Sequence, residues 1–208
     1  MTHEPSLDGA YDLKTPDDSV RLYKEWADTY DDSFVASHRY IMHEHVARAY
    51  VNAGGYQPVL DVGAGTGICG QALRDRGLDE VDATDISPDM LEVARAKNIY
   101  AHLFTGDILA KLDVEDNAYA GVVSSGTFTH GHVGPEALDE VLRIVRSGGW
   151  VALSINVEHY EAQDFADKFA ELEPLIRDLT LTEHRIYAEG GSGEHAQDTG
   201  YVALFRKV

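Results

Sequence analysis

The fold of this 208-residue chain is decided by one stretch, Pro58-Val59-Leu60-Asp61-Val62-Gly63-Ala64-Gly65-Thr66-Gly67-Ile68. A short apolar run ends in an acid, and three glycines at alternate positions lead into a helix-like segment. This order predicts a buried strand, a tight turn and the start of a helix. Glycine at positions 63 and 65 permits a positive φ, and the missing Cβ lets a ligand lie against the main chain. We expect a ligand at this turn, and a glycine-rich turn without a ligand is the alternative.

The charge balance of the chain is strongly acidic. It carries 17 Lys and Arg against 36 Asp and Glu, which gives a formal net charge of -19. Such a surface repels phosphate backbones unless it holds a local basic patch, and no dense Lys/Arg run is present. Nucleic acid is therefore not expected as a partner. The excess of acid suits either a cationic substrate or solubility in salt, and solubility is the simpler interpretation.

Neither a membrane span nor a disulfide framework is expected. No apolar run approaches the ~20 residues of a transmembrane helix. The first residues, Met1-Thr2-His3-Glu4-Pro5, lack a basic-then-apolar signal pattern. Cys69 is the only cysteine, so the sequence offers neither an internal disulfide nor a cysteine-based metal site. These features predict a soluble cytoplasmic protein without a membrane partner, present as a monomer or a homodimer.

Strand-like and helix-like segments alternate from residue 56 onward. The expected strands are Pro58–Val62, Glu80–Asp85, Ala101–Thr105, Ala120–Ser125, Trp150–Ile155, Thr182–Ala188 and Tyr201–Arg206. The expected helices are Gly67–Arg76, Pro88–Ala96, Pro135–Val145 and Glu161–Leu179. The alternation predicts an α/β fold with a doubly wound, Rossmann-like, seven-stranded and mostly parallel sheet. Residues 189–200 leave no room for a crossover helix, so we expect the last two strands to form an antiparallel edge hairpin.

Two helices are expected before the glycine turn. Asp17 and Asp18 can cap a helix that runs to Tyr30 with its apolar residues on one face. A second helix is expected over Ser37–Asn52, with Gly54-Gly55 as its stop. We therefore divide the chain into a tail (1–16), N-terminal helices that form a lid (17–55) and one Rossmann-like domain (56–208). Plain packing helices are the alternative to a lid.

Three further features lie at the sheet edge that holds the glycine turn, because ligands of open parallel sheets bind at the carboxyl ends of the strands. Asp85 ends the second strand, 18 residues after Gly67 (85 minus 67), and its two oxygens can accept both hydroxyls of a ribose. Asp107 and Ile108 follow the third strand, where the carboxylate can accept from an adenine amino group and the apolar side chain can cover the ring. The segment Ser124-Ser125-Gly126-Thr127 follows the fourth strand.

The glycine spacing distinguishes two nucleoside-containing cofactors. A dinucleotide fingerprint reads G-x-G-x-x-G and would need glycine at position 68, which is Ile68. The observed spacing is G-x-G-x-G, preceded by Asp61. A pyrophosphate prefers backbone amides without a neighbouring carboxylate. Asp61 instead suits a cationic group, such as the amino group of an amino-acid moiety. The pattern therefore favours S-adenosylmethionine over NAD.

Four motifs resemble those of the class I S-adenosylmethionine-dependent methyltransferases. They are Asp61-Val62-Gly63-Ala64-Gly65-Thr66-Gly67, Asp85-Ile86-Ser87-Pro88-Asp89-Met90-Leu91, Gly106-Asp107-Ile108 and Ser147-Gly148-Gly149. The resemblance covers about residues 20 to 208 and implies an enzyme that uses S-adenosylmethionine. In addition, Leu22-Tyr23-Lys24-Glu25-Trp26-Ala27-Asp28-Thr29-Tyr30-Asp31 is similar to the entry segment of the small methyltransferases of the Williams–Beuren-syndrome-region type.

The resemblance also implies roles for individual residues. Gly63, Ala64 and Gly65 line the methionyl part of the cofactor, and Asp61 anchors its amino group. Asp85 holds the ribose. The other implied contacts are Ile86 and Met90 beside the adenine, Asp107 and Ile108 against it, Ser124 near the methionyl end and Tyr30 closing over the cofactor.

The candidates for a general base follow the fourth strand, where the sequence reads Thr129-His130-Gly131-His132. In an extended segment, residues two apart face the same way, so both histidines would look into the pocket. His130 is the first candidate for a catalytic base or hydrogen-bond donor and His132 the second, with a structural or solvated histidine as the alternative. They lack a third ligand for a metal, so no metal site is expected. His159, after the fifth strand, is a further candidate for substrate contact.

The acceptor class follows by exclusion. The fourth strand is not followed by the Asn/Asp-Pro-Pro-aromatic run of nucleobase amino-methylating enzymes, and no acidic cluster there suggests a magnesium site. No long insertion is available to bind a macromolecule. We therefore expect methyl transfer to a small-molecule O-, N- or S-acceptor. The alternatives are an S-adenosylmethionine-binding protein without transfer activity, a nicotinamide oxidoreductase and, as a minor option, an aminopropyl-type transfer.

Overall fold

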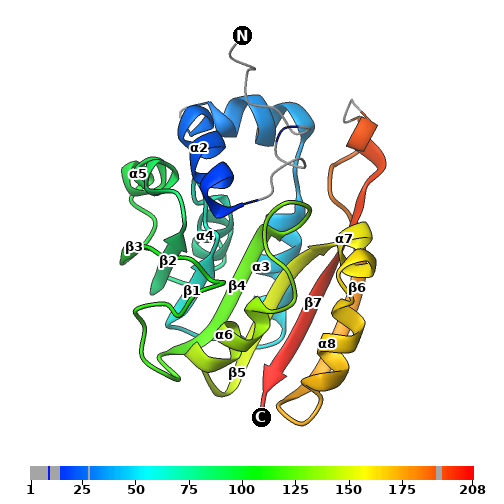
Figure 1. Ribbon diagram of the computed structural model, residues 1–208. Coiled ribbons are helices and arrows are strands. Elements are labelled where there is room, and N and C mark those ends of the chain that lie inside the picture. The colour runs from blue at the N-terminus through cyan, green and yellow to red at the C-terminus, as the bar shows by residue number, and fades with distance from the viewer. Residues whose placement is uncertain (1–8, 10–14, 28, 191–193) are drawn as a thin grey trace.

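Seven strands form a single mixed sheet in the order β3-β2-β1-β4-β5-β7-β6 (Figure 1). The computed structural model describes residues 9, 15–27, 29–190 and 194–208. The strands are β1 (Val59–Val62), β2 (Val81–Asp85), β3 (Leu103–Thr105), β4 (Tyr119–Phe128), β5 (Val145–Asn156), β6 (Ile176–Arg185) and β7 (Thr199–Lys207). The first five pair in parallel, while β7 pairs antiparallel with both β5 and β6. The expected doubly wound sheet with an antiparallel edge hairpin is confirmed.

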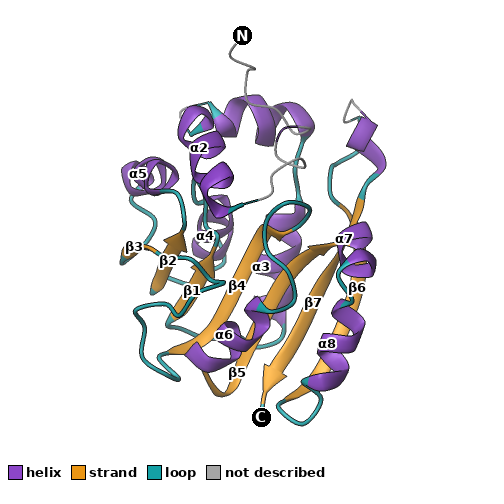
Figure 2. Ribbon diagram, viewed as in Figure 1, coloured by secondary structure: helices purple, strands orange, loops and turns teal. Residues whose placement is uncertain are grey.

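Helices cover both faces of this sheet, as Figure 2 shows. One face carries α3 (Met42–Asn52), α4 (Ile68–Arg74) and α5 (Pro88–Lys97), and the other carries α6 (Ala137–Ile144), α7 (Val157–Ala162) and α8 (Phe165–Glu171). Each face has its own apolar core, and β1 supplies both cores because its side chains alternate. Val59 packs in the core under α3 and α4, whereas Leu60 and Val62 pack in the core under α6.

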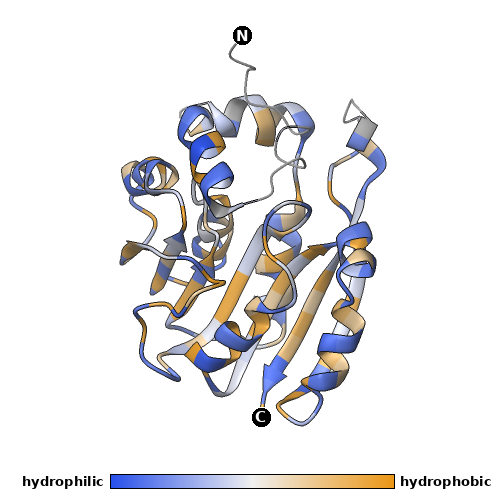
Figure 3. Ribbon diagram, in the orientation of Figure 1, coloured by the Kyte–Doolittle hydropathy of each residue, from blue (hydrophilic) through white to orange (hydrophobic). Residues whose placement is uncertain are grey.

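Hydropathy follows the same layering. In Figure 3, β4 and β5 carry hydrophobic stretches, because helices cover both of their faces, and α5 and α8 carry hydrophilic residues as well. The buried side chains of α6, such as Leu138 and Val141, close the core on one face of the sheet. No helix in the described ranges combines the length and the apolar content that a membrane span needs.

The N-terminal helices lie across the carboxyl ends of the strands (Figure 1). Helix α2 (Pro16–Trp26) is followed by a π-helix (Asp31–Ala36). The capping residue of α2 is Thr15, whose hydroxyl accepts from the amide of Asp18 at 3.2 Å, so the expectation that Asp17 or Asp18 caps this helix is wrong. Both aspartates instead lie in the first turn, where a helix favours negative charge. Most of the expected tail (1–16), and Asp28, fall outside the described residues.

Three sequence-based boundaries were wrong for tertiary reasons. The helix expected from Ser37 begins only at Met42, because Arg39 has a φ of 57° and Tyr40 makes a β-bridge with Tyr187. The helix expected over Glu161–Leu179 is two short helices, α7 and α8, separated at Asp164, which has a φ of 54°. From residue 176 onward the chain is β6, since pairing with β7 outweighs the local helical pattern. A short 3-10 helix (Glu194–Gln197) precedes β7.

Candidate active site

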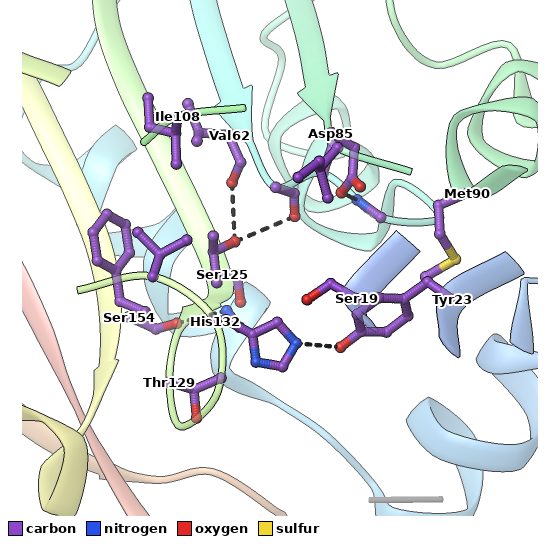
Figure 4. A pocket seen from close by; sticks show the side chains of 18 of the residues that line it. Ser19, Tyr23, Val62, Asp85, Met90, Ile108, Ser125, Thr129, His132 and Ser154 are labelled. Atoms are coloured by element: carbon purple, nitrogen blue, oxygen red, sulfur yellow. Dashed lines mark hydrogen bonds between the residues drawn. The ribbon is translucent and has the colours of Figure 1, made fainter. Parts of the chain in front are cut away.

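A cavity of about 400 Å³ opens where the expected ligand edge of the sheet meets the N-terminal helices. Its walls come from the glycine turn after β1, the ends of β2, β4 and β5, the loop after β3, and α2 with the π-helix. The strand order reverses between β1 and β4, and such a switch point is where open α/β sheets bind ligands. Figure 4 shows side chains from these separate elements converging on one space.

The glycine turn has the backbone conformation that its sequence predicts. Gly63, Gly65 and Gly67 have φ values of 65°, 55° and 94°, which other residues rarely adopt. The absence of a side chain has a different consequence at Gly63 and at Gly65, however. A Cβ on Gly63 would lie 2.0 Å from Oγ1 of Thr127, so this glycine makes room for a neighbouring strand end rather than for a ligand. A Cβ on Gly65 would meet only Met90 Cε, at 3.6 Å.

Asp85 joins the glycine turn to the next strand. Its Oδ2 accepts from the amide of Gly65 and its Oδ1 from the amide of Ser87, both at 2.8 Å. The side chain also lines the cavity, as Figure 4 shows. Burial raises the pKa of this carboxyl, although the backbone amides partly oppose the effect. A carboxylate offers about four lone-pair sites, so each oxygen keeps capacity for a ribose hydroxyl after it has accepted one amide.

Asp61 does not line the cavity, which corrects the expectation that it touches the cofactor directly. Its side chain is fully buried, and Oδ2 accepts from the hydroxyl of Tyr100 at 2.6 Å. Alternation along β1 explains this placement, because Asp61 points to the same face as Val59, toward α4. Burial raises the pKa of Asp61 to about 7, the charge of Asp85 adds to the rise, and the Tyr100 hydrogen bond opposes it.

The residues expected to surround an adenine do come together. Ile86, Met90, Asp107 and Ile108 all line the cavity. Oδ1 of Asp107 accepts from the amide of Leu109 at 2.9 Å, so the short turn after β3 holds the carboxylate in place. Ile108 is buried beside it and supplies an apolar wall. One carboxylate next to three apolar side chains suits an aromatic ring that carries an amino group.

On β4, Ser125 lines the cavity in place of the expected Ser124. Ser124 is fully buried, donates to the carbonyl of Val62 at 2.7 Å and does not line the cavity. Ser125 lines it instead and hydrogen-bonds the hydroxyl of Tyr40 at 2.9 Å. The expectation that Ser124 contacts the cofactor is therefore not met, because side chains alternate along the strand. Alternation applied to the quoted segment would have offered Ser125 as a candidate.

Aromatic side chains from the N-terminal helices form the wall opposite the sheet. Tyr23, Trp26, Tyr30 and Phe34 line the cavity, and the Trp26 and Tyr30 rings meet edge to face at 5.1 Å. Such pairs contribute about 0.5–1.5 kcal/mol beyond their buried area. Burial raises the pKa of Tyr30 well above its usual value, so its hydroxyl stays protonated.

Asp31 fastens the N-terminal helices to the glycine turn. Its Oδ1 accepts from the hydroxyl of Thr66 at 2.5 Å, and its Oδ2 pairs with the ammonium of Lys97 on α5. Thr66 belongs to the turn itself and also lines the cavity. The π-helix that begins at Asp31 therefore depends on the same loop that the sequence assigns to the cofactor.

The two histidines after β4 face different surroundings. His132 lines the cavity, whereas His130 does not. The centre of the His130 ring instead lies 5.5 Å from the centre of the His159 ring. The expectation that both look into the pocket is wrong, because the segment is a turn closed by a 3.1 Å bond from the amide of His132 to the carbonyl of Thr129. Gly131 in this turn has a φ of 75°.

His159 serves the structure rather than the cavity. It is buried, its Nε2 bonds the carbonyl of Val133 at 2.9 Å, and burial lowers its pKa. No group of three or more potential metal ligands occurs within the part of the chain that the structure describes.

Comparison with known proteins supports the cofactor interpretation. A family model described as a methyltransferase domain matches residues 59–149. The demethylmenaquinone methyltransferase of Renibacterium salmoninarum is 33% identical over 144 residues, which are 65% of this chain and 57% of that protein. Human methyltransferase-like protein 27 is 30% identical over 153 residues, 69% of this chain and 62% of the relative. The chain thus spans about three fifths of the length of these two proteins.

A solved structure extends the likeness over the whole fold. The [4+2]-cyclase SpnF superimposes with a TM-score of 0.71, covers 94% of this chain and 97% of its own, and is 16% identical. At that identity the likeness concerns the fold alone. The family model, the relatives and the motifs around the glycine turn together identify residues 59–149 as a methyltransferase domain of the class I S-adenosylmethionine-dependent type.

Proposed function

We propose that the protein transfers a methyl group from S-adenosylmethionine to a small-molecule acceptor through an oxygen, nitrogen or sulfur atom. The observation that carries this proposal is the composition of the cavity. The glycine turn, Asp85 and Asp107 line one side of the cavity. Aromatic side chains of the N-terminal helices line the opposite side. A nucleoside cofactor and an apolar acceptor can share such a space.

Named residues fit the parts of the cofactor. Asp85 would take the ribose hydroxyls, and Asp107 the adenine amino group between the apolar side chains of Ile86, Met90 and Ile108. The main chain at residues 63–65 would lie along the methionyl part. Tyr30 would cover the cofactor from the N-terminal helices, so residues 17–55 would act as a lid on the domain of residues 56–208. Asp61 and Ser124 would support the turn and the strand end from behind.

S-adenosylmethionine supplies an electrophilic methyl group on a positively charged sulfur. The protein's own contribution is to align the acceptor with it and to exclude water. Alignment in well-oriented systems lowers a barrier by up to ~7–11 kcal/mol. Trp26, Phe34 and Tyr40 are buried and line the cavity, so they provide an enclosed apolar space for the acceptor.

Several features support a small acceptor rather than nucleic acid. The binding space is bounded by the chain's own helices, and the net charge of -19 disfavours nucleic acid. The relative from Renibacterium salmoninarum is named for demethylmenaquinone, which is a small molecule. A monomer or a homodimer suffices, because the described residues of one chain form all the walls described above.

Titration calorimetry with S-adenosylmethionine and S-adenosylhomocysteine tests the cofactor half of the proposal. We expect both to bind, and we expect Asp85→Asn to weaken binding about 10- to 100-fold, because a hydrogen bond to a charged group contributes about 1.5–3 kcal/mol. Asp82→Asn is the matched control, since Asp82 lies on the same strand but does not line the cavity.

Absence of binding at millimolar concentration would overturn the proposal. Binding without release of S-adenosylhomocysteine across a broad panel of acceptors would instead favour a cofactor-binding protein with a regulatory role.

A further inference from the structure

The hydrogen bonds of His132 determine which of its ring nitrogens carries the proton. Nδ1 lies 2.8 Å from the carbonyl oxygen of His130. A carbonyl oxygen can only accept, so Nδ1 must be the donor and carry the hydrogen. In the neutral imidazole the other nitrogen, Nε2, then carries the lone pair. The turn after β4 therefore holds His132 in the tautomer that presents a base at Nε2.

That basic nitrogen is engaged by a residue from a distant part of the chain. The hydroxyl of Tyr23, on α2, lies 2.8 Å from Nε2 of His132. Because Nε2 has one lone pair, the phenol must donate to it. Figure 4 shows the two side chains pointing at each other, and both line the cavity. With the lone pair in use, a proton can reach Nε2 only by way of the Tyr23 oxygen.

The surroundings of the pair keep the imidazole neutral. Burial lowers the pKa of His132, and the nearby His159 of α7 lowers it further, while the bond to the His130 carbonyl raises it. The groups that face the ring are Tyr23 from α2, His159 from α7 and the carbonyl of His130 in its own turn. None of these is a carboxylate, so no full negative charge among them stabilises the imidazolium before reaction, and the His130 carbonyl offsets the effect of burial only in part.

We propose that Tyr23 and His132 form a proton relay that selects acceptors with an O–H or N–H group. This proposal rests on the proposed function and specifies its substrate class. As the acceptor atom forms its bond to the methyl carbon, its proton passes to the Tyr23 oxygen, and the Tyr23 proton passes to Nε2. The electron pair of the broken sulfur–carbon bond stays on sulfur. The products are the methylated acceptor, S-adenosylhomocysteine and an imidazolium at His132, so atoms and charge balance.

A proton relay would speed methylation of an acceptor that is protonated but not of one that is already ionised, whereas a purely structural contact would affect both alike. An aryl alcohol is protonated near pH 8 and must lose its proton during transfer. An aryl thiol is largely ionised there and is nucleophilic without a base. Because the cavity has an aromatic wall, we choose 2-naphthol and 2-naphthalenethiol as matched probes that differ in the acceptor atom.

The first experiment does not depend on turnover. The side-chain nitrogens of ¹⁵N-labelled protein are observed by NMR, with and without S-adenosylhomocysteine, and His132→Gln identifies the signal of interest. We expect the Nδ1–H tautomer, and a rise in the pKa of His132 in Tyr23→Phe, because the hydroxyl that stabilises the neutral ring is lost. An Nε2–H tautomer, or a titration unchanged in Tyr23→Phe, would overturn the relay.

The second experiment measures release of S-adenosylhomocysteine with each probe. Tyr23→Phe and His132→Gln should lower kcat for 2-naphthol about 10²–10⁴-fold, the usual contribution of acid–base catalysis, and leave 2-naphthalenethiol little changed. His130→Gln is the control in the same turn, because its side chain does not line the cavity. Equal losses with both probes would show a merely structural contact and overturn the relay. Faster 2-naphthol methylation in Tyr23→Phe would also overturn it, since His132 would then act directly.

Failure of the relay and failure of the proposed function give different results. A protein that binds S-adenosylhomocysteine but methylates neither the probes nor any acceptor of the broad panel counts against the function, and the NMR experiment still decides the state of the pair. A protein that methylates the thiol alone in its native form supports methyl transfer but contradicts the relay.

Discussion

Asp61 is a carboxyl with no exposed surface, held behind the glycine turn by the hydroxyl of Tyr100 at 2.6 Å. We predict that Asp61→Asn stabilises the ligand-free protein at alkaline pH and much less at acidic pH. Asparagine has nearly the same shape and still offers an oxygen to Tyr100, but it is neutral at every pH. The substitution therefore isolates the cost of burying a charge.

The magnitude follows from the pKa. Burial raises the pKa of Asp61 from its usual 3.8 to about 7. One pKa unit corresponds to 1.36 kcal/mol, so the full difference is about 4 kcal/mol. The native state keeps a proton that the unfolded chain releases between about pH 4 and pH 7. The free energy of unfolding therefore falls as the pH rises through this window, and Asp61→Asn removes that fall.

Urea denaturation at pH 5.5 and pH 8 measures the effect while avoiding the isoelectric point of about 4.7. Over this interval, the stability gap between Asp61→Asn and the native protein should widen by about 2 kcal/mol in favour of the variant. Comparing the gap at two pH values cancels any constant effect of the new amide group.

Asp82→Asn is the control, because Asp82 accepts from the hydroxyl of Tyr119 at 2.9 Å but is only half-buried. The stability gap between Asp82→Asn and the native protein, measured at the same two pH values, is the baseline for the gap of Asp61→Asn. A gap for Asp61→Asn that stays constant between the two pH values, or narrows toward pH 8, would refute the argument from burial.

Three further substitutions test the turn, the lid and the core. Gly63→Ala should abolish S-adenosylhomocysteine binding in calorimetry while the circular dichroism spectrum stays native. The added Cβ would lie 2.0 Å from Thr127 Oγ1, at a backbone φ of 65°. A native affinity would contradict this prediction. Asp31→Ala should speed dissociation of S-adenosylhomocysteine about fivefold in stopped-flow measurements, because the hydrogen bond between Asp31 and Thr66 contributes about 1 kcal/mol. An unchanged rate would show that this bond does not hold the N-terminal helices over the cavity. Phe165→Ala should cost about 3–5 kcal/mol in urea denaturation, because the ring is fully buried, and a loss below about 1 kcal/mol would mean that the core refills the space.

The cofactor half of the site was predictable because its signals are local. Gly63, Gly65 and Gly67 need positive φ within one turn, and the chain supplies glycine at each. Asp85 ends one strand and Asp107 follows the next, and the carboxyl ends of these strands must meet at one edge of a parallel sheet. Gly63, Gly65, Asp85 and Asp107 line the cavity as expected, and the seven-stranded architecture follows from the same alternation of segments.

Errors arose where alternation or pairing decided the outcome. Asp61 and Ser124 were assigned by motif, yet the two-residue period of a strand turns both away from the cavity. Residues 176–179 were expected to end a helix, but pairing with β7 makes them the start of a strand. Local propensity is weak compared with the hydrogen bonds and burial that a neighbouring strand provides.

The sequence by itself therefore determined the strand, turn and helix around Gly63, the architecture of the sheet and the class of cofactor, because each depends on short-range stereochemistry. Only the tertiary structure decided that His132 rather than His130 lines the cavity, and that Tyr23, 109 residues away in sequence, donates to it. That contact needs α2 to lie across the ends of β1 and β4. Packing of aromatic side chains and the bond between Asp31 and Thr66 produce this arrangement, and no local pattern encodes it.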